Sequence, residues 1–159
     1  MEIVRNDIEL LKRMRGLFSG INIIGLDIEI VEVSFEEGTV TIEFDVGQSL
    51  ANQLGAVQGG IVATMLDACI GIAGAVKSGG VLAMPLAEMK TSYLRPVPTG
   101  RVIGKGETLK LGKKLGFIEG ALYKDEGTLL ATASATSPPV HLGNRPDLVA
   151  VSCRSNLEP

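Results

Sequence analysis

The 159-residue chain contains one histidine, two cysteines and no tryptophan. The histidine is His141, and the two cysteines, Cys69 and Cys153, lie far apart in the sequence. These few residues exclude the usual zinc ligand sets and the paired-histidine metalloprotease motif. We therefore expect no metal and no cofactor. A Ser-His-Asp or Cys-His mechanism would depend on His141 alone, which follows two prolines late in the chain. If the protein is an enzyme, we expect its chemistry to use other groups.

Strong charge and long apolar runs are also missing. The net charge is -3, and no basic run is longer than Lys113-Lys114, which argues against nucleic-acid binding. The first sixteen residues have no apolar stretch of signal-peptide length, and the longest apolar run, Ile61–Val76, is shorter than the roughly 18 residues that a membrane-spanning helix needs. The few separated cysteines fit a reducing compartment. We expect a soluble cytoplasmic protein that binds no membrane.

The remaining patterns predict one α+β domain, in which an antiparallel sheet packs on one long helix. Residues 2–18 carry apolar side chains every three or four positions, which is typical of a surface helix. Two alternating segments joined at Glu36-Glu37-Gly38 predict a hairpin, with a bulge near Ile30-Val31 where the alternation changes phase. We divide the chain into an N-terminal surface helix (1–20), the sheet and helix (21–139) and a C-terminal tail (140–159). The predicted strands, about six, are 26–30, 39–46, 86–95, 101–110, 116–123 and 128–136.

The predicted long helix is apolar on every face except at Thr64 and Asp67. Such a helix must be covered all round, by the sheet or by a partner subunit, so we expect Asp67 to be buried. A buried carboxylate is costly unless it is paired, and such residues are often kept for chemistry. Asp67 could equally lie at a solvated subunit seam or accept structural hydrogen bonds, and the helix alone leaves the catalytic and the structural interpretations open.

Glycines precede this helix in the segment Gly55–Gly60. The amides of Gly59 and Gly60 would be unpaired first-turn donors at the positive end of the helix dipole. Such amides can hold a carboxylate, a phosphate or a developing oxyanion. The alternative is that the two glycines only make a tight turn into the helix.

The stretch from Asn52 to Asp67 resembles the signature of hotdog-fold acyl-CoA thioesterases of the phenylacetate-pathway type, the 4-hydroxybenzoyl-CoA thioesterase-like family. That signature has an Asn, a Gly-x-x-His-Gly-Gly turn and a helix with Asp eight residues after the first paired glycine. The segment Tyr93–Pro96 is similar to the end of the family's third strand. The resemblance implies a curved sheet around one long helix, a homodimer or homotetramer, and hydrolysis of aryl- or medium-chain acyl-CoA to free acid and CoA.

The resemblance also implies roles for single residues. Asp67 matches the catalytic carboxylate, Gly59 the oxyanion-binding amide, and Asn52 the residue that positions the water or the thioester. Two positions depart from the family: Gln58 replaces its usual His, and Leu86 stands where several members carry Ser or Thr. Gln can also donate and accept hydrogen bonds. The candidates for holding the substrate and its phosphates are Gln58, Gly60, Arg95, Lys113 and Lys114.

Spacing predicts the assembly independently. Gly59 and Asp67 lie eight residues apart on one helix, or about 12 Å along its axis. Groups that act on one carbonyl must each lie within about 3 Å of the reacting atoms. Two antiparallel helices across a twofold axis would satisfy this, with Gly59 of one facing Asp67 of the other. Asp67 would then activate water or attack the thioester itself.

Two other functions remain open. A hotdog dehydratase or hydratase pairs a His with a carboxylate, but His141 lies outside the predicted sheet and helix. A non-catalytic acyl-CoA binding or sensing module would be compatible with Gln58 and Leu86. Release of CoA from acyl-CoA substrates would separate this module from a thioesterase.

Overall fold

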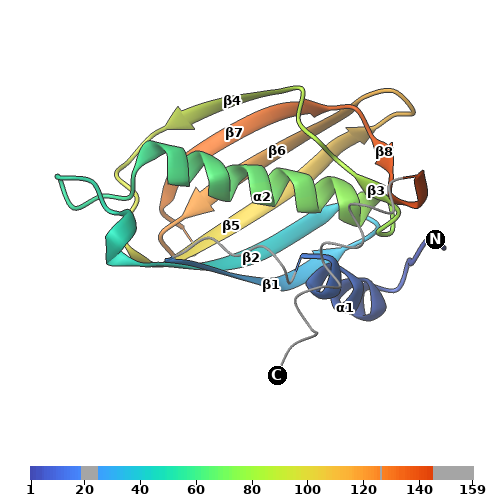
Figure 1. Ribbon diagram of the computed structural model, residues 1–159, viewed down its shortest axis with the longest axis horizontal. Coiled ribbons are helices and arrows are strands. Elements are labelled where there is room, and N and C mark those ends of the chain that lie inside the picture. Colours follow the sequence, from blue (N-terminus) through green and yellow to red (C-terminus); the bar gives the residue numbers. More distant parts are fainter. Residues whose placement is uncertain (19–24, 126, 145–159) are drawn as a thin grey trace.

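A six-stranded antiparallel sheet curves around one long helix in the computed structural model, which describes residues 1–18, 25–125 and 127–144 (Figure 1). The strand order is β1-β2-β5-β6-β7-β4, so β1 and β4 form the two edges. The predicted α+β class, with about six strands around one long helix, is confirmed. The elements of this unit are β1 (Leu26–Ser34), β2 (Thr39–Val46), α2 (Gly59–Lys77), β4 (Glu88–Tyr93), β5 (Gly100–Leu111), β6 (Gly116–Tyr123) and β7 (Leu129–Ser137).

The β1–β2 hairpin follows the predicted alternation. Ile42, Phe44 and Val46 of β2 are buried toward the helix, with polar residues between them. Gly38 closes the turn with a φ of 73°, a conformation that residues with a side chain rarely adopt. The register shifts between Ile30 and Glu32, so the predicted bulge is confirmed.

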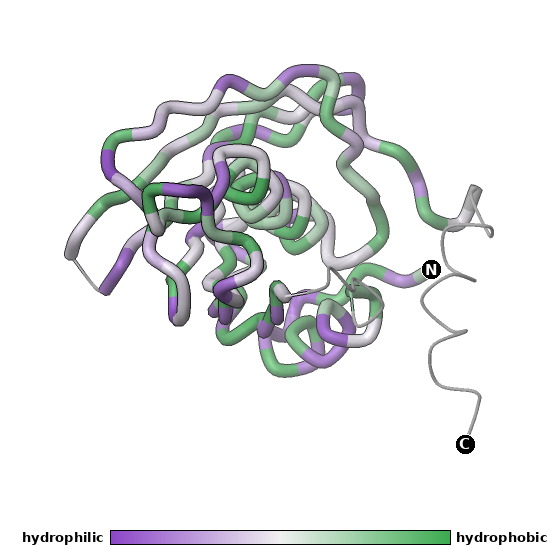
Figure 2. Tube along the Cα trace, turned by 60° about the vertical axis from the view of Figure 1, so that its left-hand side comes forward, coloured by the Kyte–Doolittle hydropathy of each residue, from purple (hydrophilic) through white to green (hydrophobic). Residues whose placement is uncertain are grey.

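Helix α2 lies under the arch of the sheet (Figure 2), and glycines of β5 allow its backbone to approach closely. A Cβ atom on Gly106 would lie 2.2 Å from the carbonyl oxygen of Cys69, and one on Gly104 would lie 2.5 Å from the Cys69 sulfur. Burial raises the pKa of the Cys69 thiol, so it stays neutral and acts as a small apolar core residue. The helix is 19 residues long, longer than the predicted run, and is apolar enough to span a membrane; just over half of it is buried inside this domain as the core helix.

Helix α1 (Asp7–Phe18) packs on β1 through the buried side chains of Leu10 and Met14. It begins at Asp7 and not at Glu2 as predicted. Asn6 explains the difference, because its Oδ1 accepts a hydrogen bond of 3.1 Å from the backbone N–H of Glu9, the pattern of an N-cap residue.

A second, two-stranded sheet pairs β3 (Leu82–Ala83) with β8 (Val140–His141), and a short 3-10 helix, η2 (Leu142–Asn144), follows. The sequence predicts no element after residue 140, because two-residue strands carry no alternation to detect. Residues 145–159 of the predicted tail lie outside the described residues. The division at 1–20, 21–139 and 140–159 stays a prediction.

Candidate active site

The start of α2 presents two backbone N–H groups to the exterior. Gln58 is the N-cap, with extended backbone, and its carbonyl accepts hydrogen bonds from Ile61 N (2.9 Å) and Val62 N (3.1 Å). Among the described residues, the N–H groups of Gly59 and Gly60 have no acceptor. Two donors at the positive end of a 19-residue helix therefore remain available to a ligand.

The backbone does not require glycine at these two positions. The glycine with positive φ in this loop is Gly55, at 78°, whereas Gly59 and Gly60 are helical. A Cβ on Gly59 would meet the Tyr93 ring at an ordinary 3.6 Å, and one on Gly60 would meet nothing within 4 Å. Glycine in a helix costs roughly 0.5–1 kcal/mol relative to alanine. A tight turn therefore does not explain why Gly59 and Gly60 are both glycine. Without side chains, these two residues let a ligand come close to their backbone N–H groups.

Asp67 lies on the same face of α2, two turns further along. Helical spacing aligns it with Gly60, Thr64 and Gly71. Its side chain is exposed in the single chain, so the expectation of a buried Asp67 is wrong for one subunit: the sheet covers one side of α2 and leaves this face open. The surrounding helix atoms still displace enough water to raise the pKa of Asp67 by desolvation.

Asn52 organises the loop before α2. Its Oδ1 accepts hydrogen bonds from Leu54 N (2.8 Å) and Ala56 N (3.2 Å), and its own N–H donates to Ala56 O. The side-chain oxygen is thus engaged in the loop. Within the part of the chain that the structure describes, the Asn52 side-chain NH₂ has no acceptor and can donate outward.

The candidate cations lie at opposite ends of the molecule. Arg95 follows β4 near the start of α2, and its Nη1 donates to the Leu129 carbonyl at 2.7 Å, which fixes the side chain. Lys113 and Lys114 are exposed in the β5–β6 turn, at the end where α2 finishes (Figure 1). A single chain therefore does not bring the two lysines to Gly59.

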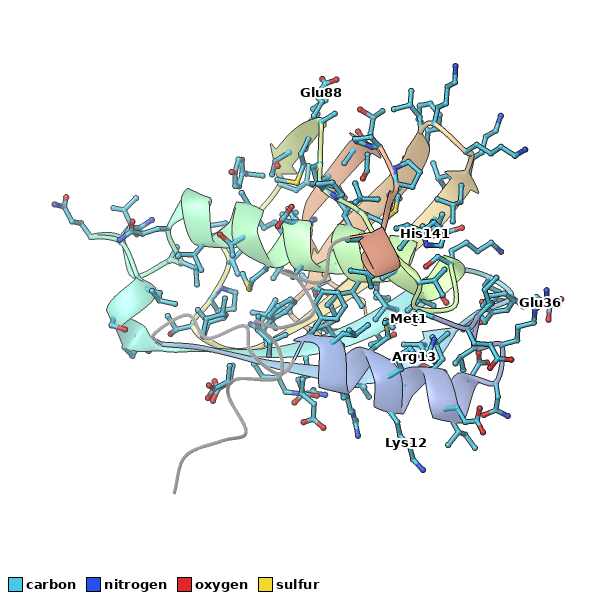
Figure 3. All side chains as sticks on the ribbon, turned by 45° about the vertical axis from the view of Figure 1, so that its right-hand side comes forward. Met1, Lys12, Arg13, Glu36, Glu88 and His141 are labelled. Carbon is cyan, nitrogen blue, oxygen red and sulfur yellow. The ribbon has the colours of Figure 1, made fainter. Side chains whose placement is uncertain are left out.

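Gln58 and Leu86, the two departures from the family pattern, also have defined places. The Gln58 side chain is exposed and makes no capping hydrogen bond, so both ends of its amide can face a ligand. Leu86 is half-buried against the core before β4. His141 is exposed in β8, beside the end of α2 and away from Gly59 (Figure 3).

Tyr93, at the end of β4, contacts the site although the sequence gives it no role there. Its hydroxyl donates to the Gly59 carbonyl at 3.1 Å, and its ring faces the Gly59 Cα. The sequence signal was its place in the Tyr93–Pro96 segment, which does not show what the hydroxyl contacts.

Among the described residues, no group of three or more His, Cys, Asp or Glu is placed to hold a metal ion.

Comparison with known proteins shows which proteins this chain resembles. Residues 54–131, which include α2 and the strands β4, β5 and β6, match the family model described as the Thioesterase superfamily. The chain is similar to this family over that segment. It is 26% identical over 106 residues to a provisionally named esterase of Thermoplasma acidophilum, a match that covers 66% of this chain and 80% of that protein. The protein is therefore a hydrolase, which disfavours both the dehydratase and the non-catalytic module.

Solved structures, some of them named as thioesterases, share the fold. A thioesterase-type, phenylacetic acid degradation-related protein from Ralstonia eutropha is 24% identical, covers 79% of this chain and 98% of its own, and has a TM-score of 0.67. Zebra fish thioesterase superfamily member 2 is 20% identical, with 86% and 99% covered and a TM-score of 0.68. The Streptococcus mutans protein smu.793, solved bound to acetyl CoA, is 18% identical, with 76% and 94% covered and a TM-score of 0.64.

Proposed function

We propose that the protein hydrolyses aryl- or medium-chain acyl-CoA thioesters to the free acid and CoA, at two sites on the seam of a homodimer. The observation that carries this proposal is the open face of α2, where unpaired amides at Gly59 and Gly60 lie in line with the Asp67 carboxylate. The acetyl CoA bound to the Streptococcus mutans protein supports a CoA thioester as substrate. The Ralstonia eutropha protein, related to phenylacetic acid degradation, supports the phenylacetate-pathway type and an aryl acyl group.

The distance between the candidate groups supports the proposed dimer. Along one helix, Gly59 and Asp67 are about 12 Å apart, which is too far for both to act on one carbonyl. Two α2 helices packed antiparallel through their open faces bring Gly59 of one subunit to Asp67 of the other. Gly71, where a Cβ would meet nothing within 4 Å, lies on the same face and leaves room for a close partner.

In this site, Asp67 acts as the carboxylate base or nucleophile. As a base, it takes a proton from water while the water oxygen bonds to the thioester carbon; the C–S bond then breaks and the proton passes to the CoA thiolate. As a nucleophile, it attacks the thioester carbon, and the C–S bond breaks to release the CoA thiolate. Water then hydrolyses the mixed anhydride, which gives the free acid and restores the Asp67 carboxylate, and the proton released goes to the thiolate. The Gly59 amide holds the oxyanion, and the Asn52 NH₂ orients the water or the thioester.

The other candidates bind the substrate. Gln58 and Gly60 flank the oxyanion position at the start of α2. Antiparallel packing would place the Lys113-Lys114 turn of one subunit near the start of α2 in its partner, on the side of Arg95. Cations from both subunits would then meet the phosphates of CoA.

We further propose that two dimers associate into a homotetramer in the cytoplasm. The outer face of the sheet carries Lys90 and Lys105 beside Glu107 and Glu119, around a hollow of about 660 Å³. Opposite charges distributed in this way can pair with a second copy of the same face. The scarcity of cysteine supports the reducing compartment.

The test is release of free thiol from a panel of acyl- and aryl-CoAs. Wild-type protein should hydrolyse at least one member, and Asp67→Asn should lose at least about a hundredfold in kcat while remaining folded by circular dichroism. Asp27→Asn, which changes an exposed carboxylate on the edge strand β1, is the matched control and should leave kcat unchanged. Binding of acyl-CoA without CoA release, or full activity of Asp67→Asn, contradicts the proposal.

A further inference from the structure

The two free amides at the start of α2 belong to peptide groups that differ in what their carbonyls accept. A peptide group is planar and conjugated, so a hydrogen bond to its C=O polarises the N–H of the same group. The N–H of Gly59 shares its peptide with the Gln58 carbonyl, which accepts from both Ile61 and Val62. The helix itself therefore polarises the Gly59 donor.

The N–H of Gly60 shares its peptide with the Gly59 carbonyl. That carbonyl accepts the hydrogen bond from the Tyr93 hydroxyl at 3.1 Å, while the Tyr93 ring faces Gly59 from the end of β4. Because α2 begins at Gly59, this carbonyl also accepts the helical N–H four residues further on. The sheet thus adds, through one side chain, a second donor to the Gly59 carbonyl, whereas both donors to the Gln58 carbonyl come from the helix.

A second hydroxyl in the same turn provides a contrast. Thr64 Oγ1 donates to the Gly60 carbonyl at 2.9 Å. The N–H of that peptide is Ile61 N, which already donates to Gln58 O. The Thr64 hydroxyl therefore acts on a peptide without a free donor, whereas the Tyr93 hydroxyl acts on a peptide whose N–H is open.

We propose that Tyr93 is a positioning residue of the thioesterase site: through the Gly59 carbonyl it fixes the first turn of α2 and strengthens the Gly60 N–H as a second donor to the thioester oxyanion. This inference rests on the proposed hydrolysis of acyl-CoA. The inference extends that proposal in two ways. The Gly60 N–H becomes part of the oxyanion hole, and the contact of Tyr93 with the Gly59 carbonyl gains a function.

The experiment compares Tyr93→Phe with wild type on the acyl-CoA of the panel that wild type hydrolyses fastest. Phe keeps the ring against Gly59 and removes only the hydroxyl. Because the added charge on the oxygen develops in the transition state, kcat should fall about two- to eightfold while KM stays within twofold. Tyr123→Phe, which removes the other tyrosine hydroxyl from the outer face of β6, should leave both constants unchanged.

The outcomes separate the two proposals. If wild type turns over and Tyr93→Phe keeps the wild-type kcat, the inference about Tyr93 is overturned and the thioesterase stands. A rise in KM with unchanged kcat, or a kcat loss that only follows a lowered melting temperature, also overturns it, because a purely structural contact would give these results. If wild type releases no CoA from any substrate, the proposed function fails and the role of Tyr93 fails with it.

Discussion

Asp67 keeps a carboxylate on a helix that is otherwise apolar, and desolvation holds its pKa above the ordinary aspartate value of about 3.9. The ionised form is therefore less stable in the folded protein than in the unfolded chain. A residue retained at a cost to stability is a common feature of functional sites. At the scale of one residue, the raised pKa therefore supports Asp67 as a candidate for the proposed site.

Asp67→Asn should stabilise the fold at neutral pH. Between the ordinary aspartate pKa and the raised pKa of the folded state, the native protein binds more protons than the unfolded one, so the wild-type free energy of unfolding falls as pH rises through this window. The Asp67→Asn variant has no carboxylate at this position, so its free energy of unfolding does not fall for this reason as pH rises. Urea titrations from pH 3 to 8 should show its advantage over wild type growing with pH and then levelling; an advantage that does not change with pH would contradict the argument.

The close contact between α2 and β5 sets the spacing of helix and sheet. Gly106→Ala would place a methyl group 2.2 Å from the Cys69 carbonyl oxygen and 3.0 Å from the Ala73 side chain. Because backbone atoms must move, we expect a loss of about 3 kcal/mol in the free energy of unfolding. Gly16→Ala is the control: it adds a methyl group to α1 with nothing within 4 Å and should gain about 0.5–1 kcal/mol. Equal effects from the two substitutions would show that the contact is not tight.

The first turn of α2 permits a test of the oxyanion donor itself. Gly59→Pro removes one N–H, and proline is favoured at the first position of a helix. The preceding residue, Gln58, already has φ -60° and ψ 141°, the extended backbone that a residue before proline prefers. We expect kcat to fall about 10²–10³-fold with little change in the circular dichroism spectrum. Retention of wild-type kcat would exclude the Gly59 amide as a donor.

The elements differ in how well the sequence predicts them. The β1–β2 hairpin, its bulge near Ile30 and the apolar helix could be predicted because their periodicity reports burial directly. The Asn6 cap was also readable, since Asn three residues before Glu9 is a helix-start pattern that the broader apolar spacing obscured. The pairing of Leu82 with His141 was not readable, because it joins two-residue strands far apart in sequence.

The site was only partly predictable for the same reason. Local spacing places Gly59 and Asp67 on one helix, and the resemblance points to Asn52. The hydrogen bonds from Tyr93 to Gly59 and from Arg95 to Leu129 depend on how β4 lies against α2 and β7, which no local pattern encodes. The openness of the Asp67 face also depends on how far the sheet curves around the helix.

At the scale of the whole molecule, the proposed seam predicts complementation between inactive subunits. Asp67→Asn and Gly59→Pro each disable every site of their own homodimer, but a mixed dimer has one site with both changes and one with neither. Equal mixing with subunit exchange should restore about a quarter of the wild-type activity. Activity of the mixture is measured against dilution series of each variant alone. No recovery, when mass spectrometry shows mixed dimers, would place the whole site within one subunit.

The edge strand β4 has a consequence for a single subunit that has not yet formed the proposed homodimer. Within the described residues, the outer backbone groups of β4 pair with no other strand, and β4 lies beside the helix face that the sheet leaves open. A newly folded monomer therefore displays a strand edge and an uncovered helix together, the surfaces through which proteins aggregate. Rapid pairing with a second copy would protect both surfaces at once. In the proposed homodimer, the association that completes the active site would therefore also cover both of these surfaces.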